Sequence, residues 1–139
     1  LEEKLQPAYE AALLEIDEPK FAELAVRLEA VLRGLEERLR RHRERRGAGA
    51  AQRFWHGERL GMVDLTYAPS LLRFAGLRQF HAWKLPEGLD AVAAWIDALA
   101  AEPLVRESFQ EEAVLRQVGA YLDNFRARAA ALAQGPGLA

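Results

Sequence analysis

The stretch FWHGERLGMVDLTYAPSLLRFAGLRQFHAWKLPEGLDAVAAWIDALAAEPLVRESF, residues 54–109, decides the fold of this chain. It opens with an aromatic-glycine turn, after which a helix begins around Val-Asp-Leu at residues 63–65. A second helix is built around Ala-Trp-Ile at residues 94–96 and is followed by Glu-Pro-Leu-Val at residues 102–105. Apolar residues in this second helix recur at steps of three and four, which predicts one buried face formed by Leu89, Val92, Ile96 and Leu99.

The same helical spacing recurs before this stretch. In residues 20–45 a phenylalanine and five leucines follow steps of three and four, with Glu and Arg on the opposite face. Residues 17–19, Asp-Glu-Pro, place an acidic cap and a proline at the start of that helix. Residues 1–16 carry a shorter apolar stripe that contains Pro7, which predicts either a kink or a helix start at that residue.

A last helix is predicted after residue 108. Ser108 followed by Glu111 forms a capping box that opens it, and residues 135–139 are predicted to be a frayed tail. Residues 75–88, with two glycines and a proline, are predicted to be irregular, and a short turn is expected at Pro103.

No strand-like alternation and no internal repeat is present in the sequence. The chain is therefore predicted to be all-α, a bundle of about five main helices in a single domain over residues 1–139. Half of the residues are hydrophobic and 29% are charged, so the chain can bury a core and its composition argues against disorder.

The composition also narrows the classes of function. The absence of cysteine excludes a disulfide framework, a thiolate metal site and a cysteine nucleophile, and it favours a cytoplasmic location. No apolar run reaches the roughly 20 residues that cross a bilayer, so no membrane partner is expected. The chain begins at Leu1 without a methionine or a signal segment, which predicts a piece of a longer protein.

Residues 38–46, RLRRHRERR, hold six arginines and one glutamate in a chain of net charge −2. Such a cluster can contact phosphates of a nucleic acid. It can equally be a solvated helix end, where arginines offset the partial negative charge of the helix C-terminus. The near-neutral total charge and the lack of a nucleic-acid fold signature favour the second interpretation, and no nucleic-acid partner is expected.

Candidate metal ligands and nucleophiles are few. The three histidines, at positions 42, 56 and 81, are spaced by 14 and 25 residues, which matches no metal signature. Ser70 lies inside a predicted helix and Ser108 is a predicted cap, so no Ser/His/Asp set can be argued. The sequence therefore predicts neither a metal site nor a catalytic residue.

Asp64 is the carboxylate with the most informative position. It stands three residues after Gly61, the predicted N-cap, and can accept hydrogen bonds from the exposed amides of the first turn. A catalytic role for Asp64 is the alternative, but its place at a helix start favours the structural role.

The ordered set of motifs resembles the C-terminal helical domain of glutathione S-transferases over nearly the whole chain. Residues 17–21 and the Leu35-Glu36 pair resemble the family's second C-domain helix. Residues 54–58 resemble the turn that follows it, and residues 102–105 resemble the turn that ends a later helix. The family's N-cap is usually Ser or Thr, and Gly61 at this position loses the reciprocal side-chain bond.

The resemblance implies a thioredoxin-like first domain, absent from these residues, that binds glutathione and activates its thiol. Glutathione would be a co-substrate of the parent protein, and this chain alone would hold no cofactor and be inactive. This domain would supply the hydrophobic pocket for a small electrophile, and a homodimer would form through helices within residues 1–45. Candidate pocket residues are Tyr9, Tyr67, Leu71 and Phe74, for which ordinary core packing is the alternative.

Two other functions stay open from the sequence. The domain could belong to a non-catalytic member that serves as a protein-interaction module. It could also be a helical bundle that acts only in assembly. A Tyr, Ser or Cys at the thiol-activating position of an upstream domain would distinguish the transferase from both.

Overall fold

The computed structural model describes residues 2–47, 53–109 and 111–134, and within them the chain is helical without a named strand. The all-α prediction is thereby confirmed. The tail predicted at residues 135–139 lies outside the described residues. The helices are α1 (Glu2–Leu14), α2 (Glu18–Arg45), α3 (Met62–Leu72), α4 (Phe74–His81), α5 (Asp90–Ala101), α6 (Pro103–Ser108) and α7 (Glu111–Ala133).

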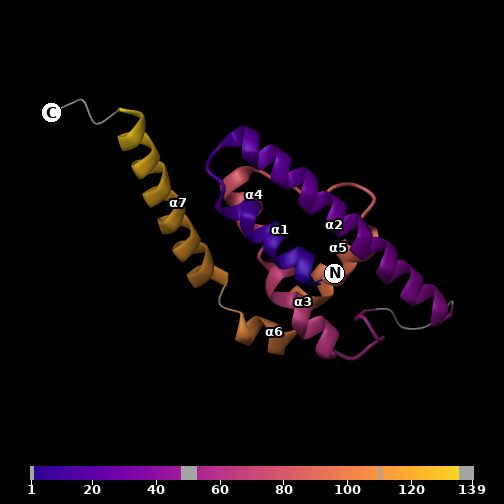
Figure 1. Ribbon diagram of the computed structural model, residues 1–139. Coiled ribbons are helices and arrows are strands. Elements are labelled where there is room, and N and C mark those ends of the chain that lie inside the picture. Colours follow the sequence, from indigo (N-terminus) through magenta and orange to yellow (C-terminus); the bar gives the residue numbers. More distant parts are fainter. Residues whose placement is uncertain (1, 48–52, 110, 135–139) are drawn as a thin grey trace.

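The core lies where α1, α2, α3 and α5 pack together, and α2 and α7 lie on opposite sides of the molecule (Figure 1). The leucine stripe predicted for α2 turns into this core because apolar burial drives its packing. Asp17 caps α2 as predicted, accepting a hydrogen bond from Lys20 N at 3.2 Å. The largest fully buried side chains include Trp95, Tyr9, Phe54, Leu28, Leu32, Leu35 and Leu39.

The aromatic-glycine turn closes on itself before α3. Phe54 N donates to Gly57 O at 2.7 Å, and Gly57 N donates to Phe54 O at 3.2 Å. Gly57 has a φ of 128°, a conformation that side chains with a Cβ rarely adopt. The turn buries Phe54, so it belongs to the core and not to a loose loop.

The structure excludes one of the two alternatives for the first helix and differs from the expectation for a later segment. Pro7 lies inside α1, so the helix does not begin there. The segment predicted to be irregular, residues 75–88, contributes most of α4, which ends at His81 and is capped by Ala82 with a left-handed φ of 53°. Tertiary packing explains α4, because Leu77 is fully buried and Gly76 lets α1 approach closely. A Cβ at Gly76 would lie 3.2 Å from Cδ1 of Leu13.

Ser108 does not cap the last helix, which corrects the capping-box prediction. It is the final residue of α6, and its Oγ donates to Leu104 O at 2.7 Å. The helix that starts at Pro103 continues through Ser108, so the hydroxyl bonds to the carbonyl four residues earlier. α7 begins at Glu111, whose side chain lies outside the described part of the chain.

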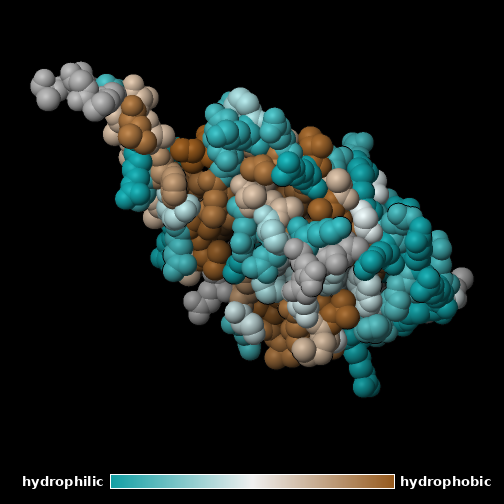
Figure 2. Space-filling model, in the orientation of Figure 1, coloured by the Kyte–Doolittle hydropathy of each residue, from teal (hydrophilic) through white to brown (hydrophobic). Residues whose placement is uncertain are grey.

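α7 packs on the bundle only through its first half. Leu122 is buried, whereas residues 123–134 are all exposed. Figure 2 shows apolar surface between α7 and the rest of the bundle, and Figure 1 shows the C-terminal end of α7 leading away from it.

Candidate functional site

Asp64 is fully buried at the start of α3 and ties three segments together. Its Oδ2 accepts a hydrogen bond from Gly61 N at 2.8 Å, which caps the helix. Its Oδ1 accepts from Trp55 N at 2.9 Å and from Trp95 Nε1 at 2.9 Å. All three partners are N–H donors, which suits an ionised carboxylate. Asp64 thus joins the aromatic-glycine turn, α3 and α5 and is directed into the core.

Glu36 performs a comparable task that the sequence reasoning did not assign. It lies on α2 and is only 5% exposed. Its Oε1 accepts from Ala91 N and its Oε2 from Val92 N, each at 2.7 Å. The N-cap of α5, Leu89, offers no side-chain hydrogen bond, so Glu36 caps α5 from a different helix. The only hint in the sequence to this role was the position of Glu36, directly after Leu35 of the leucine stripe of α2.

An aromatic cluster surrounds the Asp64 carboxylate. The Tyr67 ring lies 5.4 Å from Trp95 and 6.3 Å from Trp55, measured between ring centroids. Trp55 also stacks on His42, with centroids 5.4 Å apart. Tyr67 is therefore placed in this cluster and not in the groove described below.

His42 carries a perturbed pKa at the edge of this cluster. Burial lowers its pKa below the ordinary value of 6.5, and the charges of His56, Arg46 and Arg45 lower it further. A hydrogen bond with the backbone of Trp55 acts in the opposite direction. At neutral pH the neutral imidazole is therefore the favoured form of His42 in the folded chain.

Tyr9 is a core residue of α1, only 2% exposed. Its hydroxyl donates to Arg73 O at 2.7 Å, and its ring meets Phe74 edge-on with centroids 5.6 Å apart. Burial raises the pKa of the Tyr9 phenol, although the charge of Arg73 opposes this shift. The hydroxyl stays protonated and is occupied in linking α1 to the junction of α3 and α4.

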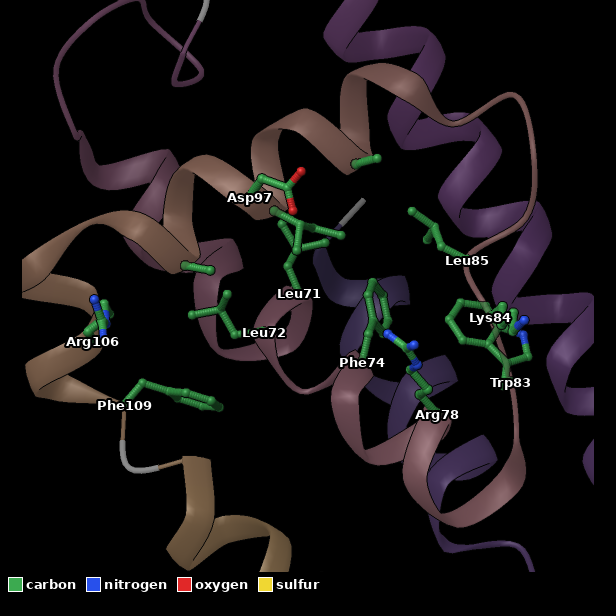
Figure 3. Close-up of a pocket in the computed structure, with 13 residues that line it drawn as sticks. Leu71, Leu72, Phe74, Arg78, Trp83, Lys84, Leu85, Asp97, Arg106 and Phe109 are labelled. Atoms are coloured by element: carbon green, nitrogen blue, oxygen red, sulfur yellow. The ribbon is translucent and has the colours of Figure 1, made fainter.

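A groove of about 800 Å³ is lined by α3, α4, α5, α6 and the segment that follows α4 (Figure 3). Its volume falls in the range of small-molecule sites, and its walls are mainly apolar. The apolar lining consists of Leu71, Leu72, Phe74, Trp83, Leu85, Ala93, Ile96, Ala100 and Phe109. The charged lining consists of Arg78, Lys84, Asp97 and Arg106.

The groove contains two of the four pocket candidates named from the sequence. Leu71 and Phe74 line it, whereas Tyr9 and Tyr67 do not. The sequence reasoning missed Trp83 and Phe109, because both lie just outside helices where no periodic pattern marks a face. Trp83 is partly buried, and its ring centroid lies 5.5 Å from that of Phe74.

The histidines do not form a metal centre in the described part of the chain. The rings of His42 and His56 meet edge-on at 5.1 Å. His81 is used elsewhere, with Nε2 2.7 Å from Leu13 O and its ring stacked on Phe21 at 4.2 Å. Within residues 2–47, 53–109 and 111–134, no group of three His, Asp or Glu residues could hold a metal ion.

The arginine-rich end of α2 is partly neutralised by its own helix. Arg40 Nε lies 3.0 Å from Glu36 Oε1, and Arg41 pairs with Glu37. Basic residues also occupy the last turn, where they offset the helix dipole. Figure 2 shows hydrophilic residues gathered at this end of the molecule.

No helix among the described residues has both the length and the apolar character needed to span a membrane.

Comparison with known proteins gave one family match. The family model described as glutathione S-transferase, C-terminal domain, matches residues 6–98. Searches of curated proteins and of solved structures returned no match. The matched range includes Glu36, Asp64 and most of the groove, and it ends before α6.

Proposed function

This chain belongs to the glutathione S-transferase C-terminal domain family, and from that premise we propose that its groove binds the apolar electrophile of a glutathione conjugation. Glutathione is the co-substrate that the family implies. We assign its binding and the activation of its thiol to a thioredoxin-like domain of the parent protein. The present domain then holds the second substrate beside the thiolate, so that a bimolecular reaction becomes an effectively unimolecular one.

The observation that carries this proposal is the lining of the groove. Nine of its thirteen lining residues are apolar, and they come from α3, α4, α5, the segment that follows α4 and the residue that follows α6. Aromatic side chains at Phe74, Trp83 and Phe109 offer ring faces and edges for a flat apolar compound. This chemistry favours binding of a small hydrophobic molecule.

Tyr9 supports placing thiol activation outside this chain. A residue that activates a thiol must accept its proton or donate a hydrogen bond to the thiolate. The Tyr9 hydroxyl already donates to Arg73 O, and burial raises its pKa. It is therefore unsuited to that role.

A binding titration tests the assignment of the groove. Methyl 1-naphthoate, a neutral aromatic probe, should bind the wild-type chain with heat measurable by calorimetry. Ala100→Phe, which adds a ring to the groove wall, should weaken binding at least about tenfold because it occupies the site. Ala127→Phe, on the exposed part of α7, is the matched control and should bind normally. Equal affinity in all three proteins would reject the groove as the site.

We further propose that the domain pairs as a homodimer through α1 and α2, within residues 1–45. Domains of this family typically dimerise. α2 lies along one side of the bundle, and Val26 on it is 68% exposed (Figure 1). Val26→Glu should shift the mass measured by light scattering toward the monomer. Leu104→Glu, a matched change at a 62% exposed residue of α6, should leave the mass unchanged.

The alternative is a non-catalytic interaction module, and the exposed half of α7 is the observation that favours it. Leu132 is 81% exposed, and the rings of Tyr121 and Phe125 contact each other at a centroid distance of 4.5 Å on the same helix. A parent protein whose upstream domain lacks a Tyr, Ser or Cys at the thiol-activating position would favour this alternative.

We place either function in the cytoplasm, and the absence of cysteine supports that location.

A further inference from the structure

We propose that the groove selects aromatic compounds that carry one acidic oxyanion group, such as a carboxylate or sulfonate. This inference rests on the proposed function of the same groove and names the class of compound it accepts. The charged lining is uneven, with Arg78, Lys84 and Arg106 against the single carboxylate of Asp97. An apolar wall with excess positive charge favours a ligand that has both properties.

The three cations are available to a ligand. The ion pairs found among the described residues join Arg33, Arg40, Arg41 and Arg126 to carboxylates, and none involves Arg78, Lys84 or Arg106. All three side chains are exposed at the rim of the groove. A guanidinium or ammonium group that already faces an apolar site can meet a carboxylate there without first breaking an ion pair.

A further positive charge lies beside the groove wall. The Arg73 guanidinium carbon is 5.9 Å from the centroid of Phe109, which is a lining residue. The Nε of Arg73 is buried and has no hydrogen-bond partner. Arg73 thus adds to the positive potential on the Phe109 side, and it disfavours a cationic ligand.

The arrangement of the side chains suggests an orientation for the ligand. Figure 3 shows Arg78 and Lys84 on the side of Phe74 and Trp83, whereas Arg106 and Phe109 lie on the opposite side. The rings of Phe74 and Trp83 are 5.5 Å apart with an interplanar angle of 50°. We place the aromatic body against these two rings and the acidic group toward Arg78 and Lys84.

Three probes that share a naphthalene ring and differ in charge test the inference: 1-naphthoate, methyl 1-naphthoate and 1-naphthylmethylamine. Calorimetry at neutral pH and low salt should show the anion binding about tenfold more tightly than the ester, and the amine binding more weakly than both. The double variant Arg78→Gln/Lys84→Gln should lose the preference and bind the anion no better than the ester. Lys4→Gln/Arg128→Gln removes the same charge from exposed sites on α1 and α7 and should behave as wild type.

The outcomes separate this inference from the proposed function. If the anion and the ester bind equally to the wild-type chain, the groove remains a site for apolar compounds and the acid selectivity is wrong. If the anion binds more tightly but the Arg78/Lys84 variant keeps that preference, the acidic group binds elsewhere and the inference is also wrong. If none of the three probes binds, the proposed function of the groove fails as well.

Discussion

At the scale of single residues, buried carboxylates organise this domain. Asp64 and Glu36 both accept hydrogen bonds from N–H groups of other segments. Without these two carboxylates, those N–H groups would have no acceptor. A buried donor without a partner costs more than its hydrogen bond contributes, so each carboxylate stabilises the fold mainly by preventing that cost.

Replacing Asp64 should show this cost directly. Asp64→Ala leaves the amides of Trp55 and Gly61 and the indole N–H of Trp95 without their acceptor, and we expect a loss of about 3–5 kcal/mol in unfolding free energy. Asp64→Asn should lose about half as much, because one amide oxygen can still accept. Urea unfolding followed by circular dichroism measures both variants. An Asn variant less stable than the Ala variant would contradict this account.

His42 should make the stability of the domain depend on pH. Its pKa is lowered in the folded chain, so the unfolded chain binds more protons over the range below the ordinary value of 6.5. The stability contributed by neutral His42 is therefore present above that pH and is lost as the pH falls through the folded pKa.

His42→Asn, which cannot titrate, should show a smaller loss of stability on acidification than wild type. Urea midpoints measured at several values between about pH 7.5 and pH 5 give the comparison. The carboxylates are the same in both proteins, so the difference between the two slopes reports His42 together with its electrostatic coupling to His56. Parallel pH profiles would mean that its pKa is not lowered on folding.

At the scale of elements, some helices of this domain depend on contacts that a neighbouring helix supplies. α5 has no side-chain cap of its own and takes Glu36 from α2. α4 is a short helix whose glycine, Gly76, admits the Leu13 side chain of α1. Neither helix has the length for independent stability, so both depend on their neighbours.

Glu36→Gln tests the dependence of α5 on α2. Glutamine has one acceptor oxygen where Glu36 uses two, so the amide of Ala91 or Val92 would face an N–H₂ group. We expect a loss of about 2 kcal/mol in unfolding free energy. Hydrogen exchange should speed up first in the opening turn of α5. Glu37→Gln, one residue away and exposed, is the control and should change stability by less than about 0.5 kcal/mol.

At the scale of the whole molecule, the domain has an apolar groove, and none of the residues that line it is poised to activate a thiol. The lining combines apolar walls with charged residues at the rim, and Tyr9 is engaged in the core. Under the function proposed above, this domain contributes substrate binding, and activation of the thiol is assigned to another domain.

The isolated chain should neither bind glutathione nor conjugate it. Calorimetry with glutathione should give no heat of binding. Conjugation of an aromatic electrophile by the chain should proceed at the uncatalysed rate, because none of the described groove residues is placed to lower the pKa of the thiol. Rate enhancement by the isolated chain would contradict the proposal that another domain activates the thiol.

The sequence alone determined the helical class, the long α2 with its buried leucines, and the cap at the start of α3. These features depend on local spacing, because residues three or four apart share a helix face whatever surrounds them. Asp64 was identified for the same reason, since its partner Gly61 lies three residues away.

The tertiary structure alone decided which side chains meet across the bundle. Trp95 reaches Asp64 over 31 residues and Glu36 reaches α5 over 55, contacts that no local pattern encodes. α4 formed despite Gly76 because burial of Leu77 outweighs a poor helix propensity. The groove likewise brings together side chains from four helices and places Tyr9 and Tyr67 elsewhere. Periodicity indicates that a helix has a buried face, but only the packing of helices decides which neighbour covers it and which residues are left to line a cavity.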